Sequence, residues 1–428
     1  DNRSRWVRQL SKCFPGGRPG SHEVINTKLL RNIIFWIHLL VGWVCGSVIM
    51  IMSVTGLLLT YERQIIAWAD HRNYPVTLSS GGVTRLPVET LLTKFREAKP
   101  HLIPVTFNLS ADPHAPAVIG ITKNESIFID PYTGEILGEA SQKVRNFFRV
   151  ITAWHRWLGM PEEYRTTGRT ITGICNLGFL FLLVSGFYLW WPRKWTWQKI
   201  RSNLWGGKSG LTGKMREFGW HNVIGFCFLV PLFIIVVSGV VISYQWADTL
   251  VYRIVGENPP AFRGNRGRPP GTDGLPHVKD IRTVSRAGDA IPKISLPLEG
   301  LDRLWIRAEQ QVLGYRNLSM RLPASDNATV IFIIDRGDGG QPQKRSSLTL
   351  ERKTAEVVSW EQFSSYPRGQ QLRFLLRFAH TGEVAGIAGQ TIAGIVSAGG
   401  AVLVWTGLAI TWRRFRARGR SGETLRHE

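Results

Sequence analysis

His38-Leu39-Leu40-Val41-Gly42 opens the first long apolar run of the chain, and Thr55-Gly56 lies near the end of that run. The same arrangement returns as His221-Asn222-Val223-Ile224-Gly225, followed by Ser238-Gly239. In both copies 18 residues separate the histidine from the later glycine, and a tyrosine follows five residues beyond that glycine. A histidine inside a membrane-length run is costly unless it has a partner, so its recurrence indicates a repeated structure.

The chain contains four apolar runs that are long enough to cross a bilayer, which requires about 20 residues. These runs are Ile33–Tyr61, Ile171–Trp191, Val223–Tyr244 and Ile387–Trp412. The first is too long for the apolar region of a signal peptide, and no small-residue cleavage site follows it. The sequence therefore predicts a polytopic α-helical membrane protein with four transmembrane helices.

The net charge of +22 is concentrated in three short segments. Lys and Arg outnumber Asp and Glu by seven to two in residues 1–32, by seven to one in 192–217 and by six to two in 413–428. Short segments rich in Lys and Arg remain on the cytoplasmic side of a membrane. We therefore expect both termini and the middle loop in the cytoplasm, the two long loops outside it, and no nucleic-acid partner.

The second and fourth apolar runs also resemble each other. One contains Ser185-Gly186 and the other Thr406-Gly407, in each case with a tryptophan five residues after the glycine and then cations. Another histidine precedes each run, His155 in the first case and His380 in the second. The chain is therefore predicted to form two parallel halves, related by an axis along the membrane normal.

The sequence of each half also predicts a small α+β domain on the outer side of the membrane. An amphipathic helix is expected at 86–98 and another at 301–312, each followed by strand-like stretches. The predicted strands are 103–109, 117–122, 126–129, 318–322, 328–334 and 346–351.

These patterns divide the chain into ten segments. They are a basic cytoplasmic segment (1–32), transmembrane helix 1 (33–62), outer domain 1 (63–143), an interfacial helix and lead-in (144–170), transmembrane helix 2 (171–191), a basic cytoplasmic loop (192–217), transmembrane helix 3 (218–246), outer domain 2 (247–372, with a Pro-, Gly- and Arg-rich insertion at 257–276), a lead-in with transmembrane helix 4 (373–412) and a basic cytoplasmic tail (413–428).

The ordered set of motifs resembles the PepSY-associated transmembrane family. Besides the four-span layout, the resemblance rests on Trp154-His155-Arg156, His380-Thr381-Gly382-Glu383 and Asp130-Pro131-Tyr132-Thr133-Gly134-Glu135. Within the family, the chain is similar to the bacterial inner-membrane siderophore-iron reductases of the FoxB type. The resemblance implies two PepSY-like domains in the periplasm, b-type haem in the helix bundle, and electron delivery to a ferric siderophore during iron uptake. Ala355 in the position of Gly134 departs from the family pattern.

The four histidines are the candidate ligands. His38 and His221 lie at the cytoplasmic side and His155 and His380 at the outer side, so two-fold symmetry would place the members of each pair opposite each other. Two imidazoles are a common way to hold haem iron, and two haems b are expected. Covalent c-type attachment is excluded because Cys-x-x-Cys-His does not occur. The alternative is that each histidine bonds a neighbouring helix, and Met160 is a rival ligand to His155.

Arg156 and Arg377 are candidates to pair with haem propionates, because they lie next to His155 and shortly before His380. The competing explanation is that these arginine side chains extend to the membrane interface, where their charged groups are hydrated. The sequence contains no P-loop, dinucleotide-binding, zinc-protease or nucleophile-elbow motif. We therefore expect no acid–base catalytic residues, and a separate electron donor such as a flavin carrier, a quinol or a partner reductase.

The first functional hypothesis is a transmembrane haem-dependent ferric-siderophore reductase in the bacterial inner membrane. The alternative is a non-redox membrane module whose PepSY domains bind a peptide, a protease or a siderophore while the histidines are structural. A third hypothesis, a siderophore transporter, suits a bundle of four spans less well.

Overall fold

The computed structural model describes residues 21–74, 76, 84–122, 125–191, 214–259, 298–323 and 329–424. Most of the basic N-terminal segment, of the loop 192–217 and of the insertion 257–276 lies outside the described residues, as do residues 425–428. The chain divides into two compact units. The first comprises Asp1–Ser47, Gly178–Leu229 and Leu403–Glu428, and the second comprises Val48–Leu177 and Val230–Val402.

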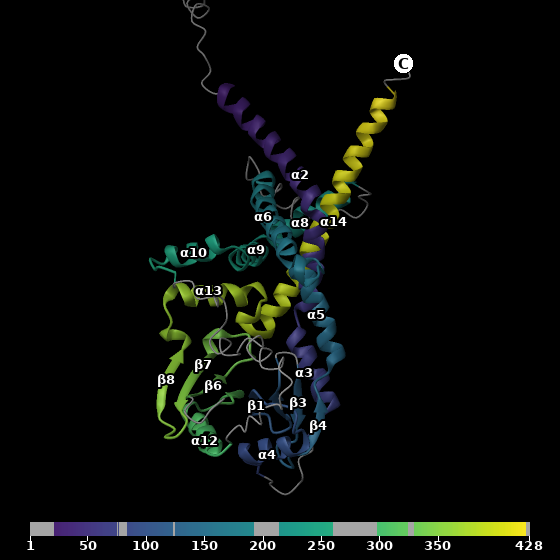
Figure 1. Ribbon diagram of the computed structural model, residues 1–428. Helices are drawn as coiled ribbons and strands as arrows, with labels where there is room; N and C mark the ends of the chain where they lie inside the picture. Colours follow the sequence, from purple (N-terminus) through teal and green to yellow (C-terminus); the bar gives the residue numbers. More distant parts are fainter. Residues whose placement is uncertain are drawn as a thin grey trace, which may run out of the picture. The chain divides into compact units, whose positions relative to one another are not determined.

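The helices and strands are labelled as in Figure 1. The helices are α2 (Ser21–Leu59), α3 (Glu62–Asn73), α4 (Val88–Ala98), α5 (Gln142–Trp157), α6 (Arg165–Trp190), α8 (Lys214–Cys227), α9 (Leu229–Ser243), α10 (Gln245–Ile254), α12 (Leu301–Gln311), α13 (Arg368–His380) and α14 (Gly386–Thr424). The strands are β1 (Thr106–Ser110), β2 (Ala117–Gly120), β3 (Ser126–Ile129), β4 (Ile136–Glu139), β5 (Asn317–Arg321), β6 (Thr329–Asp335), β7 (Arg345–Glu351) and β8 (Val357–Gln362).

Among the described residues, three stretches of helix are long and apolar enough to cross a membrane: Lys28–Asp70, Gln142–Trp190 and Glu383–Arg416. A fourth qualifies if α8 and α9 form one broken span. The break at Phe228 has a local cause, because Pro231 lacks an N–H group and its ring clashes with the carbonyl four residues earlier, at Cys227. The four predicted spans therefore correspond to three stretches that qualify by themselves and one bent pair.

The first unit packs its parts of the apolar helices through small residues. A Cβ atom at Gly178 would lie 3.0 Å from Sγ of Cys45, and one at Gly46 would lie 3.2 Å from a methyl group of Leu408. Such close approach is typical of helices in membranes, where small residues allow tight packing. Trp190 adds a stacked contact with Phe226, with ring centres 4.3 Å apart.

The second unit contains one antiparallel sheet of eight strands in the order β4-β3-β2-β1-β5-β6-β7-β8. The sequence predicts two outer domains, and each supplies four strands in a meander. The two meanders join through β1 and β5, where Phe107 is opposite Met320 and Leu109 is opposite Leu318. Pairing these strands satisfies main-chain groups that two separate sheets would leave at exposed edges, so the predicted domains share a continuous sheet.

Helices α4 and α12 lie side by side against this sheet (Figure 1). Their apolar residues recur at helical spacing, which places one face of each helix in the core. The common core contains Leu91, Phe95, Leu304, Trp305, Phe107, Leu318, Met320, Phe332 and Leu348, all buried. A single core thus unites the two repeats.

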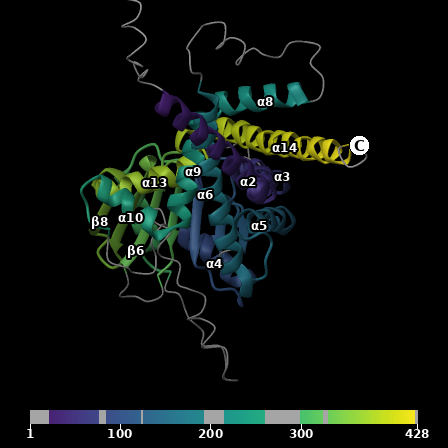
Figure 2. The ribbon, with the colours of Figure 1, turned by 90° about the horizontal axis from the view of Figure 1, so that it is seen from above.

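Four further helices of the second unit form two matching pairs. Helix α3 packs on α5, and α10 packs on α13 (Figures 1 and 2). A buried ion pair joins the two helices of each pair. Asp70 on α3 pairs with Arg145 on α5, and Asp248 on α10 pairs with Arg373 on α13. These pairs fix the helices that carry His155 and His380.

Candidate functional site

The first unit holds the histidine pair predicted for the cytoplasmic side. His38 on α2 has its Nδ1 atom 2.8 Å from the hydroxyl oxygen of Ser185 on α6. His221 on α8 has its Nδ1 atom 2.9 Å from the hydroxyl oxygen of Thr406 on α14. His38 and His221 are close enough to interact electrostatically, so the structure brings the two rings into one neighbourhood.

The second unit holds the pair predicted for the outer side. The Nδ1 atom of His155 on α5 lies 2.9 Å from the hydroxyl oxygen of Thr55 on α2. That of His380 on α13 lies 3.2 Å from the hydroxyl oxygen of Ser238 on α9 and 2.8 Å from the main-chain oxygen of Ile235. The ring centres of His155 and His380 are 6.3 Å apart and their planes are inclined by 60°.

The hydroxyl partners follow a reciprocal rule within each half of the chain. The histidine of the first span contacts the second span, and the histidine ahead of the second span contacts the first. All four hydroxyl residues are buried, whereas the four rings are half-buried. Each histidine is thus held at one ring nitrogen and has an open side.

A glycine follows each hydroxyl residue, and the edge of the histidine ring lies against it. A Cβ atom at these glycines would lie only 3.2 to 3.4 Å from the histidine Cε1 atom. The contacts are Gly186 with His38, Gly56 with His155, Gly407 with His221 and Gly239 with His380. The sequence favours helix packing as the role of these glycines, and the structure adds that each makes room for an imidazole.

A pair of facing imidazoles is a donor set that can hold haem iron. In the described ranges, no group of three or more His, Cys, Asp or Glu residues could hold a metal ion. Two imidazoles on one iron would have ring centres about 6 Å apart, because each metal–nitrogen bond is about 2 Å and each nitrogen lies about 1 Å from the centre of its ring. The 6.3 Å between His155 and His380 agrees with that spacing. No hydrogen bond between described residues reaches Nε2 of either ring.

The two arginines predicted beside the outer pair lie in its neighbourhood. Arg156 and Arg377 both interact electrostatically with His380. The Nε atom of Arg377 is buried and has no hydrogen-bond partner among the described residues. Burial lowers the pKa of the Arg377 guanidinium, and repulsion from Arg156 adds to this effect. Two cations that repel each other favour an anionic group between them.

The β6–β7 connection contacts the helix ends just beyond His380. The side-chain amide of Gln343 donates to the main-chain oxygen of Val384 at 3.1 Å. Arg63 forms an ion pair with Glu383 at 3.0 Å, and a Cβ atom at Gly340 would collide with the Glu383 side chain. The sheet is therefore in direct contact with the turn that follows the outer histidine.

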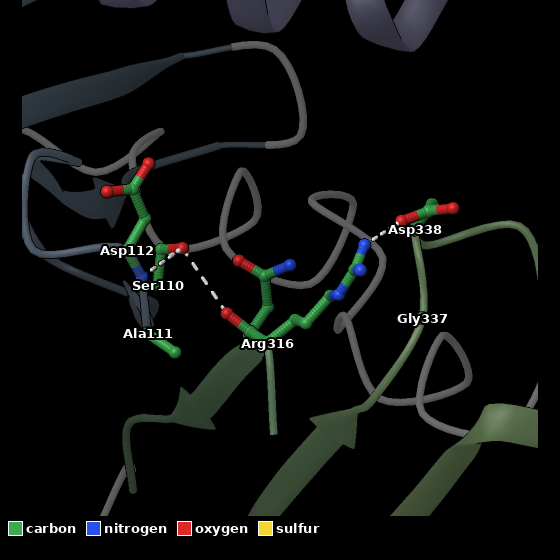
Figure 3. Close-up of a pocket in the computed structure, with 7 residues that line it drawn as sticks. Ser110, Ala111, Asp112, Arg316, Gly337 and Asp338 are labelled. Carbon is green, nitrogen blue, oxygen red and sulfur yellow. Dashed lines mark hydrogen bonds and ion pairs between the residues drawn. The ribbon is translucent and has the colours of Figure 1, made fainter. Parts of the chain in front are cut away.

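The same connection borders an open cavity of about 310 Å³ at the β1–β5 junction (Figure 3). Arg316 forms an ion pair with Asp338, and the Ser110 hydroxyl donates to the main-chain oxygen of Arg316 at 3.3 Å. A Cβ atom at Gly386, the first residue of α14, would lie 3.7 Å from a carboxylate oxygen of Asp338. The cavity is lined by Ser110, Ala111, Asp112, Arg316, Asn317, Gly337 and Asp338.

Sequence reasoning predicts that the Ser or Thr beside each glycine can hydrogen-bond to another helix, but it does not identify a histidine as the partner. The sequence contains a pattern that marks these residues, because Ser or Thr precedes glycine in all four apolar runs. The sequence alone does not specify which helix lies opposite, so the pairing of His38 with Ser185, 147 residues away, emerges only from the fold.

A search of curated proteins gave no match to this chain. A family model described as the PepSY-associated TM region matches residues 35–414. That range includes all four histidines and both sets of strands, and it covers most of each stretch that is long and apolar enough to cross a membrane among the described residues. The chain is therefore a membrane protein that belongs to the PepSY-associated transmembrane family.

Proposed function

We propose that the protein is a di-haem b oxidoreductase of the bacterial inner membrane that delivers electrons to the iron of a ferric siderophore in the periplasm. The observation that carries the proposal is the 6.3 Å separation of the His155 and His380 ring centres. The repeat extends the same assignment to His38 and His221, whose hydroxyl partners correspond to those of the outer pair.

The residues present suit electron transfer. When bound, haem would supply one-electron redox chemistry. Each pair of histidines would hold one haem iron, and haem held by two histidines would serve electron transfer rather than binding of a substrate to the iron. The glycine beneath each ring leaves room for it, and the hydroxyl group holds its orientation. The protein then needs no acid–base residues, because the iron that is reduced belongs to the substrate.

Arg156 and Arg377 are proposed to bind the propionates at the outer site. The buried, unpartnered Nε atom of Arg377 is a donor that a propionate oxygen would satisfy. A carboxylate beside the two cations would also remove their mutual repulsion. The expected effect is tighter retention of haem.

The direction of electron flow follows from the charge pattern of the sequence. Basic segments near both ends of the sequence favour cytoplasmic termini and a periplasmic sheet. His38 and Thr55 are separated by 17 positions in the sequence of α2. Electrons from a flavin carrier, a quinol or a partner reductase would enter at His38 and His221 and leave at His155 and His380.

The cavity at the β1–β5 junction is the proposed docking place for the ferric complex. The proposal is supported by the contact of the β6–β7 connection, which borders the cavity, with the turn after His380, where Gln343 donates to the main-chain oxygen of Val384. Its polar lining suits a hydrogen-bonding ligand, and its open side suits one larger than the cavity.

Anaerobic mixing tests this function. The dithionite-reduced protein, freed of excess reductant, is mixed with a ferric siderophore while the haem spectrum and a ferrous chelator are followed. We expect haem reoxidation and release of ferrous iron in equal amounts, and a large loss of rate in His380→Ala. A haem-free wild-type protein, or reduced haem that persists beside the ferric siderophore, would contradict the proposal and favour the non-redox module.

A further inference from the structure

The hydroxyl groups of Ser185, Thr55, Thr406 and Ser238 each make a second contact that determines their role. Each hydroxyl donates to a main-chain carbonyl one turn earlier in its own helix. The distances are 2.6 Å for Ser185 to Phe181, 2.6 Å for Thr55 to Ile51, 3.1 Å for Thr406 to Leu403 and 2.8 Å for Ser238 to Ile235. A hydroxyl has one proton, so its oxygen is left to accept a hydrogen bond from the imidazole.

We infer that these four hydroxyl groups are positioning residues that help to hold each histidine as the neutral tautomer with its proton on Nδ1 and leave Nε2 free to bind iron. Among the described residues, Ser185 does this by itself at His38, whereas at the other three rings the hydroxyl group shares the task with a main-chain carbonyl. The ring nitrogen that carries the proton is set by the partner of that nitrogen. Partners of this kind orient metal-binding histidines and raise their basicity. The assignment of iron to Nε2 rests on the proposed function, whereas the tautomer rests on the hydrogen bonds.

The glycine that follows each hydroxyl residue completes the device. It lets the ring edge approach the partner helix, so that the hydroxyl oxygen and Nδ1 come within hydrogen-bond distance. The Ser/Thr-Gly dipeptide in each apolar run is therefore a seat for the histidine of the neighbouring helix. The same dipeptide serves all four rings, which argues against a chance contact at any one of them.

The four seats differ in their alternative acceptors. Among the described residues, the Ser185 oxygen is the acceptor that the structure shows for Nδ1 of His38. At His380 the Ile235 carbonyl lies at 2.8 Å, closer than Ser238 at 3.2 Å. Main-chain carbonyls of Met52 and Leu403 also interact with His155 and His221. Removing the hydroxyl should therefore have a strong effect at His38 and little effect at His380.

Ser185→Ala and Ser238→Ala make a chemically matched pair for the test. Each full-length variant is purified with haem, and the rate of haem transfer to an excess of apomyoglobin is measured beside the low-spin electron paramagnetic resonance g values. We expect Ser185→Ala to lose one haem about 10- to 100-fold faster and to shift its g values. Ser238→Ala should behave like the wild type, and Ser185→Thr should restore the wild-type rate.

Equal rates of loss from the two alanine variants would overturn the inference while leaving haem binding intact. A wild-type protein without haem would instead refute the proposed function. The tautomers would then be read from ¹³C and ¹⁵N chemical shifts of histidine-labelled apo-protein. In that case, Ser185→Ala must change the tautomer of one histidine ring, and Ser238→Ala must leave every tautomer unchanged. A wild-type ring protonated on Nε2 would overturn the inference.

Discussion

The ring centres of His155 and His380 lie 6.3 Å apart, although 225 positions separate the two residues in the chain. Each histidine lies at or near the end of a helix that precedes an apolar helix, and each helix is tied to its neighbour by a buried ion pair. The two rings meet because the two halves of the second unit repeat each other. The effects of single substitutions near the histidines and the ion pairs can therefore be measured one at a time.

Gly186→Ala is expected to displace His38. The added Cβ atom would lie 3.3 Å from Cε1 of His38 and would meet no other atom within 4 Å. The ring must move away from Ser185, which weakens its hydrogen bond. We expect the haem content of the purified variant to fall by about one haem per chain.

Gly42→Ala is the control for Gly186→Ala, because the nearest atom to its added Cβ is a methyl group of Leu182 at 3.8 Å, an ordinary contact. Its haem content should equal that of the wild type. Equal losses in both variants would mean that helix packing, and not the seat of His38, is responsible.

Asp248→Ala should destabilise the second unit because it leaves Arg373 as an uncompensated buried charge. The exposed fractions of the two side chains are 7% and 16%. Breaking a buried pair in this way typically costs about 3–5 kcal/mol. The measurement is the free energy of unfolding of the detergent-solubilised protein.

The double variant Asp248→Leu with Arg373→Met should regain most of that loss, since replacing both charges is often neutral. Asp70→Ala should cost less than Asp248→Ala, because its partner Arg145 is 28% exposed. A double variant as unstable as the single one would contradict this account of the ion pair.

Much of this architecture follows from local patterns. Residues 301–311 form a helix where 301–312 is predicted, and β6 and β7 start within one residue of the predicted strands. These segments follow the periodicity of their own apolar residues, which sequence reasoning can read. Ala355 is also informative: it adopts the left-handed conformation with φ of 61°, as Gly134 does with φ of 73°, so the second turn keeps the geometry of the first without its glycine.

Other features depend on contacts between distant segments. The sequence predicts two outer domains, but the union of β1 and β5 depends on which edges meet. The hydroxyl partners of the histidines are likewise set by the helix that lies opposite. The helix break at Phe228 has a local cause, Pro231. The sequence prediction missed this break because the run around Pro231 is apolar throughout.

Asp302 is expected to make stability depend on pH. Its carboxylate accepts the main-chain N–H of Glu89, and the Glu89 carboxylate accepts that of Asp302, both at 3.1 Å. Burial raises the pKa of Asp302 above 3.8, and repulsion from Glu89 adds to this, although the hydrogen bonds oppose it. Because the folded-state pKa is the higher one, the contribution to stability is full below about pH 3.8 and is lost as the pH rises through the folded-state pKa.

Asp302→Asn keeps an oxygen that can accept the Glu89 N–H and removes one charge. At pH 7 the variant should melt at a higher temperature than the wild type, and this difference should disappear near pH 3. Melting temperatures measured across this range check the sign. A difference that grows as the pH falls would show that Asp302 stabilises the fold as a carboxylate.

The haem content of the purified wild-type protein, measured beside His221→Ala and His380→Ala, tests the central claim most directly. We expect about two haems b per wild-type chain with the sharp reduced bands of six-coordinate iron, because each pair of histidines occupies both axial positions. Each variant should retain one haem, and the two remaining haems should differ in spectrum or potential. A colourless wild-type protein, or variants that lose both haems or neither, would contradict the assignment of the two histidine pairs.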